Sequence, residues 1–435
     1  MSTDAQKLSK KFTKTEKSWI LYDWANSVYA TNIMAVIFPI YFGNVCAQNG
    51  ADNLVLWSYG TSVATFISAI LAPILGSLAD HKGHKKRLFI GFLAIGLVFT
   101  LFSALVDSYQ MLLVGYVVSH IGFSGSCLFY DSFLTDVTTS QRMDRVSSWG
   151  YAMGYIGGST IPFVLSIVIL VAMGMDNPLA FKLIILLTTA WWAVFSIPFL
   201  KNVHQIHSLP PRKNLIRSTF QNLWTTLKDI FTQKRVFFFI VAYFFYIDGV
   251  NTIISISTSY GSKLGLSDIS MILALLVTQI VAVPFSILFG KLAGKLVSIN
   301  LLCGAVCIYF CICAVGFFMG FNIEQHPGED SALTLSMVLF WCMAFLVGTV
   351  QGGIQALSRS YFGKLIPPER SNEYFGFFDI FGKFAAVIGP LLVATFTQMT
   401  GRDSIGVISL AILFAIGGAI LFGGRKTLFR TEETR

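Results

Sequence analysis

The chain alternates between long apolar stretches and short polar connections. A helix needs about 20 mainly apolar residues to cross a bilayer. Twelve stretches meet this length, near residues 19–42, 54–79, 87–106, 109–133, 147–173, 178–200, 236–260, 267–293, 296–320, 332–361, 373–398 and 403–424. The pattern predicts an all-α integral membrane protein with an N-terminal six-helix bundle (1–200), a linker (201–235) and a C-terminal six-helix bundle (236–435).

The linker carries a second, amphipathic pattern. Apolar residues recur at helical spacing opposite Arg217 and Lys228, and they are Leu215, Ile216, Phe220, Leu223, Trp224, Leu227, Ile230 and Phe231. This spacing predicts a helix that lies on the inner membrane surface and joins the two bundles. A helix that binds a partner protein is the alternative.

Composition and charge placement agree with a membrane protein. Hydrophobic residues make up 54% of the chain and charged residues 12%, whereas soluble domains average about 25% charged residues. If the N-terminus is cytoplasmic, the exterior connections keep only Lys182, Lys263 and Arg402 among the basic residues. This bias predicts that both termini are cytoplasmic. It also accounts for the net charge of +9 without nucleic acid as a partner.

One polar motif occurs in the first span of each half. Asp23-Trp-Ala-Asn26-Ser27 and Asp248-Gly-Val-Asn251-Thr252 share the pattern Asp-x-x-Asn-[Ser/Thr]. A carboxylate at the bilayer centre costs roughly 2.5–3.5 kcal/mol on insertion scales, and such residues usually mark a pathway. Their repetition predicts a site between two similar halves, where the carboxylates bind a substrate ammonium group or carry protons. The structural alternative is that each one only fixes helix packing.

Two other spans in the second half carry polar faces. Asp379 and Lys383 are four residues apart, so they can pair along one helical face. Lys383 is a candidate to hold a substrate carboxylate, with a self-neutralised structural pair as the alternative. Gln351 and Gln355 form a candidate cavity wall, whereas we expect Arg359 to reach the membrane interface, because an Arg near a helix end often does so.

The fourth span carries further ionisable residues. Asp131 and Asp136, where this span ends, are expected to be gate or loop partners of Arg142 and Arg145. His120 lies near the middle of the span. We interpret it as a hydrogen-bonded packing residue rather than a proton site.

A charged loop links the second and third spans. Its sequence, Gly76-Ser-Leu-Ala-Asp80-His-Lys-Gly83-His-Lys-Lys-Arg87, resembles the signature loop of the major facilitator superfamily. The resemblance implies that Gly76 and Gly83 allow close approach and that Asp80 holds the cytoplasmic side closed by pairing with an Arg or a helix N-terminus of the other half. Arg142 is a further candidate gating residue. His81 and His84 replace the Arg residues usual in the family.

Two further segments narrow the resemblance. They are Tyr22-Asp-Trp-Ala-Asn-Ser-Val-Tyr29, and the stretch from Gln351 through Ile366-Pro-Pro-Glu-Arg370 to Phe375-Gly-Phe. Both resemble the branch that contains the autophagy-related vacuolar effluxer and many bacterial transporters. For the vacuolar member the family role is amino-acid efflux. The short loops of this chain are closer to the bacterial members, which implies a bacterial cytoplasmic membrane.

The chain is therefore predicted to be a secondary transporter of a small polar metabolite, such as an amino acid, that works by alternating access. Proton coupling and uniport both stay open at this point, as do sugars, nucleosides and drugs. The rival classes are an intramembrane enzyme that uses Asp23 and Asp248 as a dyad, and a receptor or scaffold. The chain contains no Gly-x-x-x-x-Gly-Lys-[Ser/Thr] loop for a nucleotide. We predict no cofactor or metal site, and a monomer whose partners are its substrate and membrane lipid.

Overall fold

A computed structural model describes residues 11–174, 176–210 and 215–433. Within these ranges, twelve helical spans are long and apolar enough to cross a membrane. The first half comprises α1 (Lys14–Tyr29), η1 (Ala30–Ala35), α2 (Ile37–Gln48), α3 (Asn53–Ala79), α4 (His84–Leu105), α5 (Tyr109–Ser132), α6 (Leu134–Val137), α7 (Ser140–Met153), η2 (Gly154–Thr160), α8 (Ile161–Met173) and α9 (Pro178–Asn202). This confirms the predicted all-α fold for that half.

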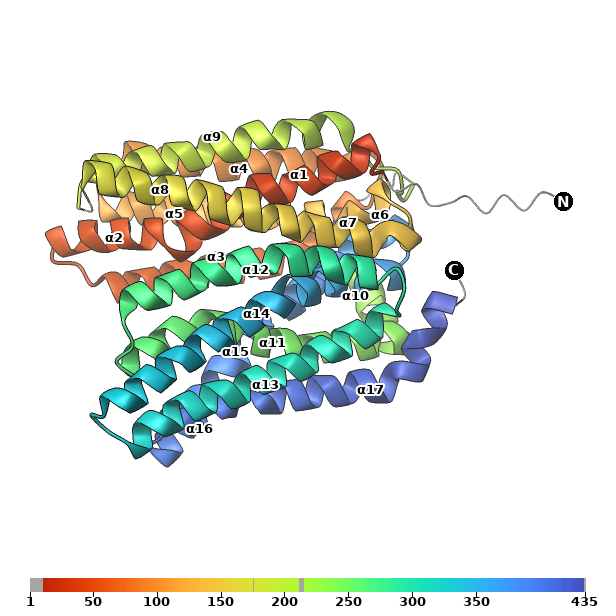
Figure 1. Cartoon of the computed structure of the whole chain (residues 1–435). Coiled ribbons are helices and arrows are strands. Elements are labelled where there is room, and N and C mark those ends of the chain that lie inside the picture. Colours follow the sequence, from red (N-terminus) through yellow and green to blue (C-terminus); the bar gives the residue numbers. More distant parts are fainter. Residues whose placement is uncertain (1–10, 175, 211–214, 434–435) are drawn as a thin grey trace.

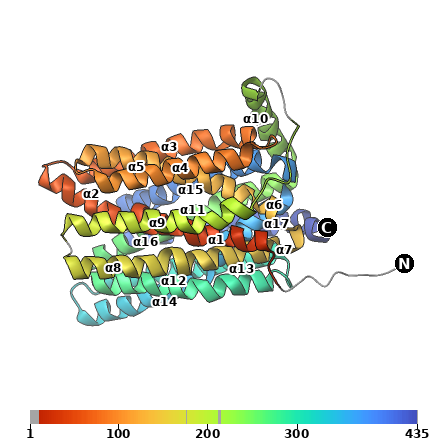
Figure 2. The ribbon, with the colours of Figure 1, turned by 90° about the horizontal axis from the view of Figure 1, so that it is seen from above.

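The second half repeats the arrangement after one linker helix. Its elements are α10 (Leu215–Thr232), α11 (Lys234–Lys263), α12 (Asp268–Leu292), α13 (Ser298–Gln325), α14 (Asp330–Leu365), η3 (Pro368–Arg370), α15 (Ser371–Thr400), α16 (Asp403–Ile408) and α17 (Ala411–Glu433). Figure 1 shows the two halves packed side by side. The start of α1 and the end of α17 lie on the same side of the bundle (Figures 1 and 2), which we call the terminal side; the opposite side is the distal side.

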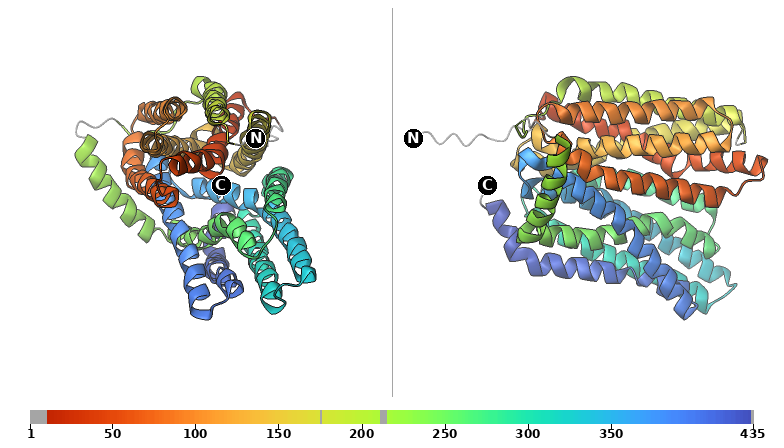
Figure 3. Two further views of the ribbon diagram at one scale, coloured as in Figure 1. Left: turned by 90° about the vertical axis from the view of Figure 1, so that its left-hand side faces the viewer. Right: turned by 180° about the vertical axis from the view of Figure 1, so that it is seen from behind.

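The linker helix α10 lies on the terminal side, and Figure 3 shows it running across the direction of the spans. It contacts α3, α11 and α15. Ile230 of the predicted apolar face is buried, whereas the Trp224 side chain is 71% exposed. The side chains of Leu215, Ile216, Arg217 and Phe220 fall outside the described side chains.

The first and fifth spans each contain a π-helical turn, η1 and η2, and such turns are frequent at functional sites. The two spans can approach closely because the fifth span has a glycine where it meets the first: a Cβ on Gly158 would lie 2.1 Å from the Cβ of Ser27. Thr31 of η1 donates a 3.0 Å hydrogen bond to Ser159 of η2. The first span is thus held against the fifth beside the Asp23 motif.

Candidate functional site

A cavity of about 260 Å³ lies between the two halves. Its lining comes from α5 and α7 of the first half and from α11, α14 and α15 of the second. The lining residues are Cys127, Leu128, Asp131, Tyr151, Tyr243, Ile247, Asn251, Gln355, Arg359, Phe375, Phe378, Asp379, Gly382 and Lys383. Both halves therefore contribute charged groups to one cavity.

Arg359 of α14 forms the main charged link between the halves. Its Nη2 lies 3.2 Å from the Asp23 carboxylate of α1, and its Nη1 lies 2.9 Å from that of Asp131 of α5. Its Nε donates to the Ser147 hydroxyl of α7 at 3.0 Å. The guanidinium also lies over the rings of Trp19 and Tyr151, at 4.7 Å and 4.5 Å. The side chain is 5% exposed, so the expectation that it reaches the membrane interface was wrong.

Lys383 and Asp379 of α15 form a second link. The Lys383 Nζ lies 2.5 Å from the Asp379 carboxylate and donates to the Ser124 hydroxyl of α5 at 2.6 Å. The predicted pairing along one helical face is present, and Lys383 also binds the opposite half. This extra contact distinguishes the pair from one that only neutralises itself.

The exposed fraction of the side chain differs between the acidic and the basic residues that line the cavity. The Asp131 side chain is 33% exposed and that of Asp379 is 29% exposed, whereas Arg359 is 5% and Lys383 is 18% exposed. The two cations are surrounded by protein partners, and the carboxylates present more of their surface. The groups that the cavity leaves open to a ligand are therefore mainly carboxylate oxygens, which are negatively charged and accept hydrogen bonds.

The Asp-x-x-Asn motifs of the two halves occupy different environments. Asp23 accepts hydrogen bonds from Arg359 and, at 2.7 Å, from the Tyr130 hydroxyl, and it lies beside the cavity lining. Asp248 is fully buried and accepts from the backbone N–H of Gly389 at 3.0 Å and from the Thr252 hydroxyl at 3.3 Å. The structure thus brings Asp23 to the cavity cluster and places Asp248 in the packing of α11 against α15.

Of the remaining predicted ligand residues, some line the cavity and others are buried outside it. Asn251 and Gln355 line the cavity. Asn26 is buried and lies 3.9 Å from the sulfur of Cys127, and Gln351 is buried in α14 outside the lining set. Four of the eight predicted site residues, Asn251, Gln355, Asp379 and Lys383, therefore surround one space. Their role in binding stays a prediction.

Asp80 holds the two halves together on the terminal side. Its carboxylate accepts from the backbone N–H groups of Asn372 and Glu373, at 2.9 Å and 3.0 Å, in the first turn of α15. These donors have no partner inside the helix, and the helix dipole favours an anion there. Gly76 permits the contact, because a Cβ would lie 2.4 Å from the Asn372 carbonyl oxygen. This is the geometry that the family resemblance implies for a closed gate.

The other predicted gating residues act within the first half. Gly83 has a φ of 80° and directly precedes α4, so it serves a turn that disfavours other residues. The Nε and Nη2 of Arg142 each donate to Glu16 of α1 at 2.7 Å. The prediction that Arg142 or Arg145 would pair with Asp131 and Asp136 was wrong: Asp131 pairs with Arg359, and Asp136 pairs with Lys85.

Asp136 ties the linker to the closed gate. Its carboxylate lies 2.7 Å from the Nζ of Lys85, and both groups are fully buried. It also accepts from the backbone N–H and the ring of His207, at 2.8 Å and 3.2 Å. Lys85 in turn donates to Ser371, at the start of α15, at 3.2 Å. The chain that follows α9 is therefore fastened to the same point where the two halves meet.

Sequence reasoning missed one further link between the halves. Asp144 of α7 pairs with Lys364 of α14 and accepts from the Ser360 and Ser298 hydroxyls at 2.6 Å and 2.8 Å. It lies in a basic loop region next to Arg142 and Arg145, so a local reading assigns it to them. Only the approach of α7 to α13 and α14 reveals its partners.

Comparison with known proteins places this geometry in a family. A family model described as "Vacuole effluxer Atg22 like" matches residues 52–141 and 135–423. An uncharacterized MFS-type transporter of Bacillus subtilis, YxiO, is 45% identical, over 98% of this chain and 97% of its own. The chain belongs to this family.

More distant proteins agree with the assignment. Autophagy-related protein 22-1 of Aspergillus fumigatus is 23% identical, over 82% of this chain and 72% of its own. The proton:xylose symporter XylE matches in structure with a TM-score of 0.66 at 10% identity and covers 94% of both chains. The predicted membership of the Atg22 branch of the major facilitator superfamily is confirmed, and this Atg22-family chain is a multi-pass membrane transporter.

Proposed function

We propose that this transporter moves small metabolites that carry an ammonium group, amino acids above all, and couples their movement to protons. The observation that carries the proposal is the exposure of Asp131 and Asp379, one from each half, to a single cavity. Two partly exposed carboxylates favour a cationic group of the ligand by Coulomb attraction, which is strong where water is scarce. Both halves then bind the same ligand, as alternating access requires.

The size and the remaining lining of the cavity support such a ligand. A volume of about 260 Å³ is just below the range of about 300–1,000 Å³ that is typical of drug-sized ligands, which suits a compound the size of an amino acid. Tyr151, Tyr243, Phe375 and Phe378 supply aromatic faces, and these attract ammonium groups. Asn251 and Gln355 add hydrogen-bonding amides.

The contacts between the halves indicate how alternation proceeds. Asp80, Lys85, Asp144 and Arg359 all reach across to the other half near the ends of α3, α4, α7 and α14 that face the terminal side. We propose that both termini are cytoplasmic, in a bacterial cytoplasmic membrane, because the basic residues gather in terminal-side connections. The structure then represents a state closed to the cytoplasm, and inward opening must separate these contacts.

Proton coupling has support from the same residues and from a structural neighbour. A proton on a cavity carboxylate would weaken its attraction for an ammonium group or for a paired Lys. XylE is described as a proton:xylose symporter. The aspartate-dyad enzyme is disfavoured because Asp23 and Asp248 have separate partners, Arg359 and the Gly389 backbone.

The test is uptake of a mixed pool of labelled amino acids into proteoliposomes, with and without an inward proton gradient. Asp131→Asn should lower gradient-driven uptake by about tenfold or more, since it removes a charge that contacts the ligand. Asp107→Asn is the control, because Asp107 is 80% exposed and pairs with Lys182 on the distal side. Wild-type uptake without any response to the gradient would reject proton coupling, and uptake unchanged in Asp131→Asn would reject this cavity as the site.

A further inference from the structure

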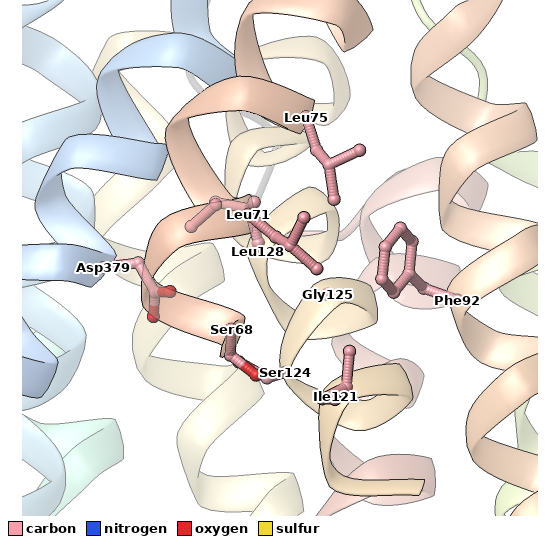
Figure 4. A pocket seen from close by; sticks show the side chains of 10 residues that line it. Ser68, Leu71, Leu75, Phe92, Ile121, Ser124, Gly125, Leu128 and Asp379 are labelled. Carbon is pink, nitrogen blue, oxygen red and sulfur yellow. The ribbon is translucent and has the colours of Figure 1, made fainter. Parts of the chain in front are cut away.

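A second, much smaller pocket lies beside the cavity, and Asp379 lines both. It has a volume of about 10 Å³, close to the space that one water molecule occupies, roughly 10–15 Å³. Its other walls come from α3, α4 and α5, all in the first half. Figure 4 shows Asp379 reaching from the second half toward Ser68 and Ser124 at one end of this pocket, with leucines and Phe92 around the rest.

The hydroxyl of Ser68 is the evidence that this pocket holds a molecule. It is 5% exposed, and no described protein group hydrogen-bonds to its hydroxyl. A buried hydroxyl without a partner costs about 1–3 kcal/mol, which a water molecule in contact with it would offset. Ser124, also in this pocket, accepts from Lys383 at 2.6 Å. The polar groups needed to hold one water, two to four in number, are therefore present.

The charges around Asp379 favour water over a metal cation. On its own helix Asp379 faces Lys383, whose ammonium lies 2.5 Å away, and that positive charge would repel a sodium ion. From the helices packed against it, the titratable and charged groups are Asp131, Cys127 and His120 on α5, Tyr151 on α7, Tyr243 on α11 and Arg359 on α14. Within the small pocket α3 and α4 add only Ser68 and apolar side chains.

We propose that this pocket is the proton-coupling site: one water molecule bound by Ser68 and Ser124 delivers the coupling proton to Asp379. The inference rests on the proposed function and locates its coupling step. In one relay step the water accepts a proton from the cavity and passes one of its own to a carboxylate oxygen of Asp379. The water is regenerated, and Asp379 becomes a neutral acid. Lys383 keeps its own protons and its hydrogen bond to Ser124, but it loses its anionic partner.

Release of Lys383 links the proton to the substrate. The freed ammonium of Lys383 can bind the carboxylate of an amino acid whose own ammonium group lies against Asp131. Asp379 reaches the water only while α15 packs against α3 and α5. Rocking of the halves therefore withdraws Asp379 from the pocket and exposes its proton to the other side of the membrane. Proton and substrate then cross together.

The experiment fills the pocket without touching the substrate cavity. Ser68→Val replaces the hydroxyl and the water space with methyl groups, and Ser68→Ala removes only the hydroxyl. Ser77→Ala is the matched control: Ser77 is on the same helix, is 1% exposed and also has an unbonded hydroxyl, but it lies outside the pocket. Proteoliposomes with an entrapped pH dye report proton entry upon addition of amino acids, and exchange of labelled substrate without a gradient reports binding.

We expect Ser68→Val to lower proton entry per transported substrate by about tenfold or more, which is within the effect of losing a positioned proton donor. Exchange is compared at acidic pH, where Asp379 can take its proton directly from the cavity that it also lines. There it should stay within about twofold of the wild type, as for a substitution that leaves the binding residues intact. Ser68→Ala should change proton entry in the same direction by less, and Ser77→Ala should behave as the wild type.

Different results would overturn the coupling pocket and the proposed transport function. Wild-type proton entry in Ser68→Val would overturn the coupling pocket alone. Transport driven by a sodium gradient in place of protons would overturn proton coupling and the pocket with it, but not the binding of ammonium-bearing substrates. Absence of transport of any ammonium-bearing compound by the wild type would overturn the proposed function together with it.

Discussion

Substitution of Gly76 by Ala should open the terminal side. A Cβ at this position would lie 2.4 Å from the carbonyl oxygen of Asn372, 2.8 Å from its carbonyl carbon and 3.1 Å from the Cα of Glu373. All three are backbone atoms in the first turn of α15, which Asp80 holds in place, so a rotamer change cannot relieve the clash. Overpacking of this kind typically costs about 1–3 kcal/mol.

This cost falls only on the state in which α3 touches α15 at that turn. A differential free energy of about 1–3 kcal/mol changes the ratio of two conformations by roughly 5- to 150-fold. Folding in detergent should change much less, because the open state relieves the contact. The substitution therefore acts as a selective perturbation of the gate.

Spin-label distances measure this shift directly. In a cysteine-free background, one label pair at the exposed positions Lys82 and Lys295 spans the terminal side, and another pair at Asn53 and Glu329 spans the distal side. Gly76→Ala should lengthen the first distance and shorten the second. Gly91→Ala is the control, because a Cβ there meets nothing within 4 Å. Unchanged distance distributions in Gly76→Ala would refute the account of the gate.

Three further predictions concern single residues. Arg359→Gln leaves the largely buried Asp23 and the partly exposed Asp131 without their cation, which should cost up to about 3–5 kcal/mol of stability; an unchanged melting temperature in detergent would contradict this. Asp248→Asn should retain uptake, because an amide oxygen can still accept from Gly389, and a loss of uptake would instead support the binding role predicted from the repeat. The hydrogen bond to Asp136 raises the pKa of His207, so this contact is complete below the ordinary value of about 6.5 and is lost as the pH rises through the raised pKa. Imidazole NMR should show that raised pKa, and a value at or below the ordinary one would refute the contact.

The fold could be predicted from the sequence because membrane spans are encoded by length and hydrophobicity alone. Each of the twelve predicted stretches overlaps one helical span, with differences of several residues at some ends. The gate at Asp80 could be anticipated for a similar reason. Its loop is a local motif that resembles the signature loop of the superfamily, and this resemblance implied a partner on the other half, either an Arg or a helix N-terminus.

The cavity residues were harder to predict, because their roles depend on contacts between the halves. Arg359 was expected at the membrane interface from its place in α14, and the fold instead buries it against Asp23 and Asp131. A signal for this was available. The first six predicted stretches contain basic residues only near their ends, at Arg87 and Lys182. The two carboxylates inside these stretches, Asp23 and Asp131, therefore find no cation within their own spans, which favours a partner from the other half.

For the two Asp motifs, the sequence predicted a similarity that the structure does not show. The repeat assigns Asp23 and Asp248 the same role, but Asp23 contacts Arg359 while Asp248 contacts the backbone at Gly389, next to Pro390. The contact depends on the glycine itself, because a Cβ on Gly389 would lie 2.8 Å from the Asp248 carboxylate and 2.0 Å from the Thr252 hydroxyl oxygen. Sequence repetition alone does not reveal such a local break in symmetry.

The central claim is that the cavity selects an ammonium group, and a substrate comparison tests it most directly. Wild-type proteoliposomes would be given labelled amino acids together with an excess of either the same amino acids or their 2-hydroxy acid analogues, which replace only the ammonium group. The account predicts that amino acids compete for uptake and that the hydroxy acids do not. Equal competition by both would contradict it, because the carboxylate of Asp131 would then have no part in recognition.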